Sequence, residues 1–265
     1  LQAFEFSCGT DVPSEVCDRD HYETINATEA ATYFIQNYGY RRVLEKSICL
    51  RDGNCFDIVD GVVYLDDRYV FTRDIAEGDL LLSRMYLKLP RKVNYATYNI
   101  YDTAQWKVNK TRLDFASYTT TMIEEMFTSG AVDMSRETEA QVLSIGLGAG
   151  FVNSYLHHNY PKLNITVVDI EPKIVDVCLR WFDLQLDERH RAIVADGVKF
   201  IHDAAKEGRK YDAVHIDACT TDLSSELACP IPIFLNPETV AALSKILTKK
   251  GSSSEFFFPF IKYSH

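Results

Sequence analysis

The stretch Val142-Leu-Ser-Ile-Gly-Leu-Gly-Ala-Gly150 decides the fold of this chain. Residues 141–145 form a short apolar run that predicts a buried strand, and the three glycines that follow predict a loop in which the backbone turns tightly and approaches a ligand. A helix is expected next, over residues 151–160. Strand, glycine loop and helix in this order are typical of a nucleotide-binding βα unit.

An acid follows the next predicted strand, residues 165–168. Asp169 comes 23 residues after the first glycine of the loop, where a carboxylate can accept hydrogen bonds from both hydroxyls of a ribose. The Gly-x-Gly-x-Gly spacing suits a mononucleoside with an amino-acid tail better than a dinucleotide pyrophosphate, and S-adenosyl-L-methionine is such a ligand. The cofactor-binding residues predicted here are Gly146, Leu147, Gly148, Gly150, Asp169 and Ile170.

The third predicted strand, residues 192–195, is followed by Asp196 and Gly197. Asp196 is placed to accept from the exocyclic amine of an adenine, with Gly197 leaving room for the ring. The alternative is that Asp196 only caps the helix that follows. Because both residues come in register after the glycine loop and the ribose acid, we predict that they bind the cofactor.

The fourth predicted strand, residues 213–216, ends at Asp217, and Asp222 follows five residues later. Ligands of open α/β sheets lie outside the carboxyl ends of the strands, so Asp217 is predicted to bind the cofactor and to act in catalysis on an amine. Asp222 is the second catalytic candidate, although a loop acid is more often solvated. His215 is expected in the core, and Cys219 is expected to be an unreactive thiol. No metal site is predicted.

Composition narrows the classes of partner. The chain has 265 residues, of which 46% are hydrophobic and 25% charged, and its net charge is -10. The excess of acids disfavours a nucleic-acid backbone or an anionic membrane surface as the main partner, because both require clustered cations. No window reaches about 18 consecutive apolar residues, so no membrane-spanning helix is expected.

The two parts of the chain differ in their pattern. Residues 1–112 are predicted to form a small, mainly β domain, whose exposed edge could pair in a homodimer. Residues 113–265 alternate strands and helices, which implies a parallel sheet with helices on both faces. In the first part we expect a helix within 20–38 and strands at 62–65, 69–72, 80–87 and 95–101. Beyond those already named, the second part should contain helices at 117–127, 172–182, 198–207 and 237–247.

Cysteines and glycosylation sequons bear on the compartment. Cys8 and Cys17, and Cys49 and Cys55, form two close pairs beside turn residues, as short disulfide loops would. Three Asn-x-Ser/Thr sequons also occur. The three asparagines are Asn26, Asn109 and Asn164. Together these features favour a glycosylated protein that is secreted or resides in the secretory-pathway lumen, with a cytoplasmic protein carrying free thiols as the alternative.

Five short motifs follow one another in a fixed order through residues 113–251. They are Gly146-x-Gly-x-Gly150, Val168-Asp-Ile-Glu-Pro172, Ala195-Asp-Gly197, Tyr211-Asp212 and Asp217-x-x-x-x-Asp222. This order resembles the spermidine-synthase-like class I methyltransferases, and residues 217–251 are especially similar to the C-terminal domain of those that modify elongation factor 1-alpha. The resemblance implies a Rossmann-like doubly wound sheet that binds S-adenosylmethionine across its first four strands, with Asp169 on the ribose and Asp196 near the adenine.

The expected activity is S-adenosylmethionine-dependent methyl transfer to an amine of a protein or small molecule. One alternative is aminopropyl transfer, for which the related synthases carry an Asp-x-x-Asp after strand four and a carboxylate in the helix before strand one. Here the two acids are five residues apart, and the helix position is Thr121. A diamine site without its anions would leave ammonium groups unpaired. The other alternative is a catalytically inactive, secreted binding protein that retains the fold.

Both ends of the chain depart from expectation. The chain begins at Leu1 rather than Met, so it is expected to be processed or a fragment. After Gly251, residues 252–265 replace the apolar fifth strand and antiparallel edge pair of the family. Residues 256–258 are the expected remnant of the fifth strand, with Pro259 removing a ladder donor. The C-terminal strands are therefore expected to be truncated, leaving strand four or five poorly covered.

Overall fold

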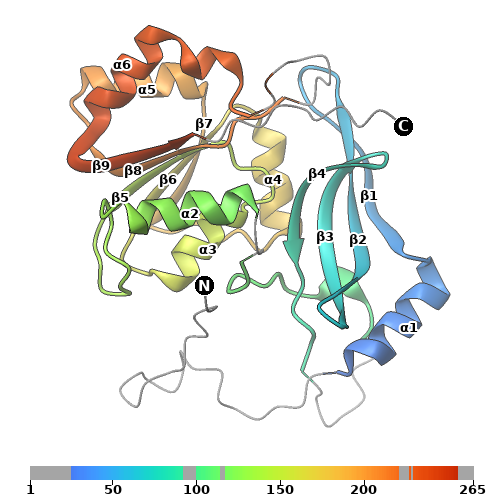
Figure 1. The fold of residues 1–265 in the computed structure, drawn as a ribbon. Coiled ribbons are helices and arrows are strands. Elements are labelled where there is room, and N and C mark those ends of the chain that lie inside the picture. The colour runs from blue at the N-terminus through green and yellow to red at the C-terminus, as the bar shows by residue number, and fades with distance from the viewer. Residues whose placement is uncertain (1–24, 92–99, 114–116, 221–226, 228, 256–265) are drawn as a thin grey trace.

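The computed structural model describes residues 25–91, 100–113, 117–220, 227 and 229–255. Their strands form two sheets, an antiparallel sheet and a parallel sheet flanked by helices (Figure 1). The first contains β1 (Arg41–Cys49), β2 (Cys55–Leu65), β3 (Arg68–Glu77) and β4 (Leu80–Tyr86) in chain order. The second has the order β7-β6-β5-β8-β9, so the predicted α/β class with a preceding β part is confirmed.

The antiparallel part follows the sequence pattern closely. Strands β2, β3 and β4 contain or overlap the three predicted runs between residues 62 and 87. Most of the fourth run, 95–101, lies outside the described residues. Helix α1 (Ala27–Tyr38) falls within the predicted range and is capped by Asn26, whose side-chain oxygen accepts from the amides of Thr28 and Glu29. It buries Ala30, Ala31 and Phe34, which recur at helical spacing and face the first sheet.

The parallel part places its strands and helices within a few residues of the predicted positions. Each strand presents successive side chains to opposite faces, and both faces are covered. For example, Val142 lies in one buried cluster with Leu156 of α3, whereas Leu143 lies in a second cluster with Ile201 of α5. The bounds are α2 (Tyr118–Thr128), β5 (Gln141–Ile145), α3 (Phe151–Asn159), β6 (Asn164–Asp169), α4 (Pro172–Trp181), β7 (His190–Val194), α5 (Gly197–Lys206), β8 (Tyr211–Ile216), α6 (Pro237–Ile246) and β9 (Leu247–Glu255).

The fifth strand of the parallel sheet begins earlier than expected. β9 pairs with β8 over registers from Tyr211↔Leu247 to Ile216↔Glu255, so strand four is covered. The predicted remnant at 256–258 lies outside the described residues. Residues 249–254 read Lys-Lys-Gly-Ser-Ser-Ser, which contains no apolar residue. An edge strand can pair through its backbone alone, and this is why the hydrophobic pattern missed it.

The two sheets share one hydrophobic cluster. It contains Phe71 and Met85 of the antiparallel sheet together with Leu156 and Val177 of α3 and α4. The predicted boundary between residues 112 and 113 precedes α2 and stays a prediction. None of the described helices is both long and apolar enough to cross a bilayer.

A buried ion pair lies where the antiparallel sheet meets α4. Asp60 of β2 and Arg73 of β3 face each other in register, with Nε–Oδ1 and Nη2–Oδ2 distances of 2.7 and 3.1 Å. The same guanidinium donates to the backbone oxygens of Trp181, at the end of α4, and Thr103. Because the ionic groups have several protein partners and almost no exposed surface, this cluster joins the two parts of the fold.

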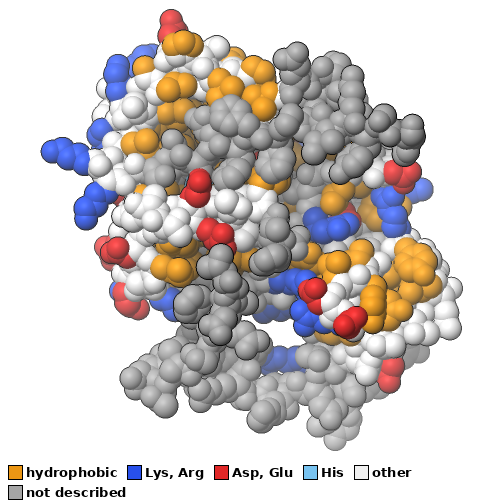
Figure 2. Space-filling model, viewed as in Figure 1, with side chains coloured by type: hydrophobic (Ala, Val, Ile, Leu, Met, Phe, Trp, Pro, Cys, Tyr) orange, Lys and Arg blue, Asp and Glu red, His pale blue; other side chains and the backbone are white. Residues whose placement is uncertain are grey.

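The β1 edge of the antiparallel sheet carries exposed apolar side chains. β1 is an edge strand, and apolar side chains gather over α1 and the adjacent strand in Figure 2. Tyr40 and Val43 are 67% and 42% exposed. Such a patch beside an edge that no other described strand pairs with is compatible with pairing of two copies, and the homodimer stays a prediction.

Candidate functional site

The predicted site residues converge because they follow parallel strands. β5, β6, β7 and β8 are neighbours in one sheet, so their carboxyl ends meet along one edge. The glycine loop and Asp217 come directly after β5 and β8, Asp169 is the last residue of β6, and Asp196 lies two residues after the end of β7. Asp222 lies outside the described residues, and its role stays a prediction.

The glycine loop is shaped by a close approach of the backbone. Gly146 has φ of 94°, and a Cβ there would lie 2.3 Å from the carbonyl oxygen of Asp217. A side chain at this position would therefore drive the ends of β5 and β8 apart. Gly150 has a left-handed conformation and begins α3. The amide of Ala149 in the same loop donates to the hydroxyl of Ser83 on β4, at 3.0 Å.

Asp169 is held in place by the backbone on both sides. Its Oδ2 accepts from the amide of Leu147 in the glycine loop, and its Oδ1 accepts from the amide of Glu171, each at 2.8 Å. Burial raises the pKa of this carboxyl, while the two backbone bonds act in the opposite direction. Each carboxylate oxygen can accept more than one hydrogen bond, so both can still accept from a ribose. Beside it, the apolar side chain of Ile170 is 61% exposed.

Asp196 and Gly197 have structural roles in this conformation. Asp196 is the N-cap of α5, and its Oδ1 accepts from the amide of Lys199 at 2.9 Å. A Cβ at Gly197 would lie 2.6 Å from Cγ2 of Ile145 and 3.2 Å from the ring of Phe234. These close contacts within the protein explain why residue 197 is a glycine, and no ligand is needed for that explanation. The predicted contacts of Asp196 and Gly197 with adenine stay predictions.

Asp217 lines a cavity of about 240 Å³ between the two sheets. The remaining wall is supplied by strand β4, the first turn of α2, Ser144 of β5, the glycine loop and the start of α3. The hydroxyl of Tyr118 donates a hydrogen bond to the Asp217 carboxylate, and burial raises the pKa of Asp217 to about 7. The cavity thus contains a carboxyl group whose pKa is raised toward neutrality by its surroundings.

A guanidinium lines the same cavity. Arg84 projects from β4 and forms a two-pronged pair with Asp74, with Nε–Oδ1 and Nη2–Oδ2 distances of 2.9 and 2.8 Å. Sequence reasoning missed Arg84, Tyr118 and Ser83, which come from elements before the parallel sheet. For Tyr118 the sequence did offer a signal, because Ser117 is a typical helix cap. A helix that begins after Ser117 places Tyr118 at the end of α2 that lies nearest the sheet edge.

Two disulfides are present in the described residues. The predicted Cys49–Cys55 bond is confirmed, and Cys8 and Cys17 lie outside the described residues. Cys219, expected to be an unreactive thiol, is instead bonded to Cys229, and its sulfur lies 3.3 Å from Oδ1 of Asp217. That expectation was wrong because nothing in the local sequence pairs two cysteines ten residues apart.

Other groups near the edge are inert. His215 is 1% exposed, and neither of its ring nitrogens has a hydrogen-bond partner within the described part of the chain. Burial lowers its pKa to about 4, so it stays neutral in the core, as predicted. The free thiol of Cys178 is buried, which raises its pKa. Asp217, Cys219 and Cys229 lie close enough to hold a metal ion, but both sulfurs are committed to the disulfide.

Comparison with known proteins finds a family match in the second part of the chain. Residues 121–252 match the family described as "Spermine/spermidine synthase domain". An "eEF1A lysine and N-terminal methyltransferase homolog" of Drosophila melanogaster is 34% identical over 116 residues, which cover 44% of this chain and 17% of the relative. A "Polyamine aminopropyltransferase" of Vibrio vulnificus is 35% identical over 78 residues, 29% of this chain and 26% of the relative.

Among solved structures, human "Methyltransferase-like protein 13 in complex with SAH" is similar with a TM-score of 0.44 and 25% identity, over 51% of this chain and 60% of that chain. A probable spermidine synthase from Corynebacterium glutamicum gives a TM-score of 0.49 and 14% identity, over 77% and 61%. The chain spans about a sixth of the length of the first curated relatives, so their activities as whole proteins do not transfer directly.

Proposed function

Residues 121–252 match the family described as a spermine/spermidine synthase domain, and on that premise we propose that the protein is an S-adenosylmethionine-dependent methyltransferase acting on an amine. The observation that carries the proposal is the placement of Asp169. Loop and helix amides fix its carboxylate beside the glycine loop, and Leu147 of that loop also lines the cavity that contains Asp217. The proposed ribose acid and the partly buried carboxyl of Asp217 are thus joined by one loop.

The residues present fit such a cofactor. Asp169 would hold the ribose, the exposed Ile170 would cover one face of the base, and the loop from Gly146 to Gly150 would follow the amino-acid tail. When bound, the cofactor would supply an electrophilic methyl group on a sulfonium. The protein's own contribution is then to bind the acceptor in line and to keep water out, because methyl transfer requires no covalent enzyme intermediate.

Asp217 is the group that would act on the acceptor. Its Oδ atoms can accept a hydrogen bond from an ammonium, orient it and take up the proton that leaves when the amine becomes a nucleophile. Tyr118 donates to the same carboxylate and so holds its orientation. The test is mass analysis of candidate amine acceptors after incubation with S-adenosylmethionine. A methylated product whose formation requires Asp217 would support the assignment. No product with any folded preparation and a broad acceptor panel would count against it.

The pH dependence follows from the pKa of Asp217. Since burial raises this pKa to about 7, the carboxyl should be mainly protonated at pH 6 and mainly ionised at pH 8. We expect kcat/KM to rise roughly tenfold per pH unit below the pKa and to level above it. Stability should respond in the opposite sense. The folded pKa lies above the ordinary value of 3.8, so the folded state binds more protons between about pH 4 and 7 and loses stability as pH rises through that window.

That profile has a matched control. In Asp217→Asn the ionisation is absent, so the stability loss between pH 4 and 7 should shrink in thermal melts. A kcat/KM that is flat across pH 5 to 8 in the wild type would contradict the assignment of Asp217 as the proton acceptor.

Aminopropyl transfer is the second candidate, supported by the family match and by the aminopropyltransferase relative. Its substrate is a diamine, which requires anions at both ends. Among the described residues that line the cavity, Asp217 is the one acid, and Arg84 is a cation. A cavity with one acid and one cation among its described residues lacks, in that part of its lining, the second anion that a diamine requires, and it therefore favours methyl transfer. Mass analysis distinguishes the two reactions, because decarboxylated S-adenosylmethionine yields an aminopropylated product only in a synthase.

We also propose that the protein acts in, or passes through, the secretory pathway. The Cys49–Cys55 and Cys219–Cys229 bonds support this location, because disulfides persist in oxidising compartments. In such a compartment a binding protein that retained the fold without catalysis is the competing hypothesis. Intact mass of the native protein before and after reduction and deglycosylation tests the location. Free thiols and no glycan would overturn it.

A further inference from the structure

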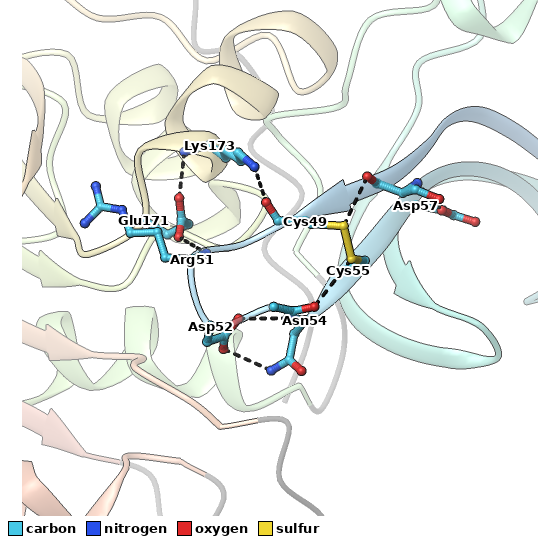
Figure 3. The surroundings of a disulfide bond; sticks show 10 residues. Cys49, Arg51, Asp52, Asn54, Cys55, Asp57, Glu171 and Lys173 are labelled. Atoms are coloured by element: carbon cyan, nitrogen blue, oxygen red, sulfur yellow. Dashed lines mark hydrogen bonds between the residues drawn. A yellow bond between two sulfur atoms is a disulfide. The ribbon is translucent and has the colours of Figure 1, made fainter.

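The tip of the β1–β2 hairpin is closed by a disulfide and lies against the first turn of α4 (Figure 3). Cys49 and Cys55 are direct partners at the end of the β1–β2 ladder, so their bond closes the loop of residues 50–54. Within that loop the carboxylate of Asp52 accepts from the amide and the side chain of Asn54. The loop is therefore restrained by covalent and hydrogen bonds and has little conformational freedom of its own.

One side chain connects this tip to the ribose acid. Glu171 is 7% exposed and accepts from the amide of Arg51 through Oε2, at 3.0 Å, and from the amide of Lys173 through Oε1, at 3.3 Å. Its own amide donates to Oδ1 of Asp169. A second contact runs in parallel, because the ammonium of Lys173 donates to the carbonyl oxygen of Cys49.

The same tip forms one wall of a second cavity, of about 460 Å³. Leu50, Asp52 and Asn54 line it on the side of the tip. Cys219, Thr220 and Ile231 line it opposite, in the segment that follows Asp217. The tip thus faces the segment after β8 across open space and touches the segment after β6.

We infer that Glu171 is a positioning residue that couples the disulfide-closed hairpin tip to Asp169, so that an intact Cys49–Cys55 bond tightens the binding of an adenosyl cofactor. This inference rests on the proposed function and extends it to the antiparallel part of the chain. The coupling runs from Arg51 through Glu171 to Asp169 and the glycine loop, and each link is a hydrogen bond of the described structure. In this inference Glu171 acts through Asp169 and not on the cofactor directly.

The test separates the cap of α4 from the contact with the tip. Glu171→Asp retains a good helix cap and the negative charge, but its shorter side chain no longer reaches Arg51. We expect it to weaken binding of S-adenosylhomocysteine about tenfold in calorimetry, the scale of one lost charge-assisted hydrogen bond. Cys49→Ser with Cys55→Ser should weaken binding similarly. Combining the three changes should add little, because they remove the same link. In turnover assays KM for the cofactor should rise while kcat is unchanged.

Glu45 provides the matched control. Its carboxylate also joins β1 to α4, but at the far end of that helix, through Arg180 and the indole of Trp181. Glu45→Asp should leave the affinity for S-adenosylhomocysteine within twofold of wild type. If Glu171→Asp and the double serine variant both fold and bind like wild type, the inference is overturned and the proposed function stands. If wild type itself does not bind S-adenosylhomocysteine, both the inference and the proposed function fail. If Glu45→Asp weakens S-adenosylhomocysteine binding as much as Glu171→Asp does, the loss of affinity reflects a general loss of stability, and the coupling through Glu171 is overturned.

Discussion

Asp217→Asn is expected to lower kcat about 10²- to 10⁴-fold while S-adenosylhomocysteine still binds. The reason is chemical, since an amide has nearly the shape of the carboxyl group but cannot take up the proton of an ammonium at neutral pH. The cavity should stay intact, because Tyr118 can still donate to the amide oxygen. The measurement is a single-turnover methylation assay with the acceptor identified by mass analysis, beside calorimetry on the same preparation.

Tyr118→Phe is the control for this prediction. It removes the hydrogen bond to Asp217 but not the carboxyl, so its effect on kcat should be smaller than that of Asp217→Asn and should come with a shifted pH profile. Since the Tyr118 bond lowers the pKa of Asp217, its loss should move the profile to higher pH. An Asp217→Asn variant with full activity would remove Asp217 from the mechanism.

The second large effect concerns stability. Arg73→Leu should lower the free energy of unfolding by about 3–5 kcal/mol, because it leaves the Asp60 carboxylate buried without its cation. Both side chains are almost fully buried, and the guanidinium also satisfies the backbone oxygens of Trp181 and Thr103. Chemical denaturation is the measurement, and it should show the two parts of the chain losing cooperativity as well as stability.

A double variant and a surface pair serve as controls. Removing both charges, Asp60→Leu with Arg73→Leu, should cost less than Arg73→Leu alone, because no unpaired charge stays buried. Arg41 and Asp79 form an exposed ion pair at 3.0 Å, and Arg41→Leu should leave stability unchanged. An Arg73→Leu variant as stable as wild type would show that the junction between the sheets does not depend on this cluster.

Much of the parallel sheet could be predicted from local pattern. Gln141–Ile145 and the glycine loop give their own signals, and Pro172 marks the start of α4. These elements are determined by residues close in sequence. β9 was missed because its central residues are polar and its pairing with β8 is made by the backbone, which leaves no side-chain pattern.

A residue of the site could be predicted from the sequence only where the end of a single strand supplies its side chain. Asp169 is the last residue of β6 and Asp217 follows β8 directly, so both reach the common edge. Arg84 and Tyr118 reach the same cavity from β4 and α2, and only tertiary packing brings them there. The disulfide of Cys219 with Cys229 depends likewise on how the chain returns after β8, which no local pattern encodes. Asp196 is the converse case. It occupies a motif position that predicts a cofactor contact, but its geometry in the structure is explained by helix capping.

The proposed cofactor site is tested most directly by calorimetric titration with S-adenosylmethionine, S-adenosylhomocysteine and decarboxylated S-adenosylmethionine, using wild type and Asp169→Ala. We expect wild type to bind the first two, and Asp169→Ala to weaken binding of both by a factor of 100 or more while the protein stays folded, because the ribose loses a charged acceptor held by two amides. Preference for the decarboxylated form would instead favour aminopropyl transfer. No binding of any of the three by folded wild type would contradict the cofactor site itself, and would leave a binding or structural protein built on this fold.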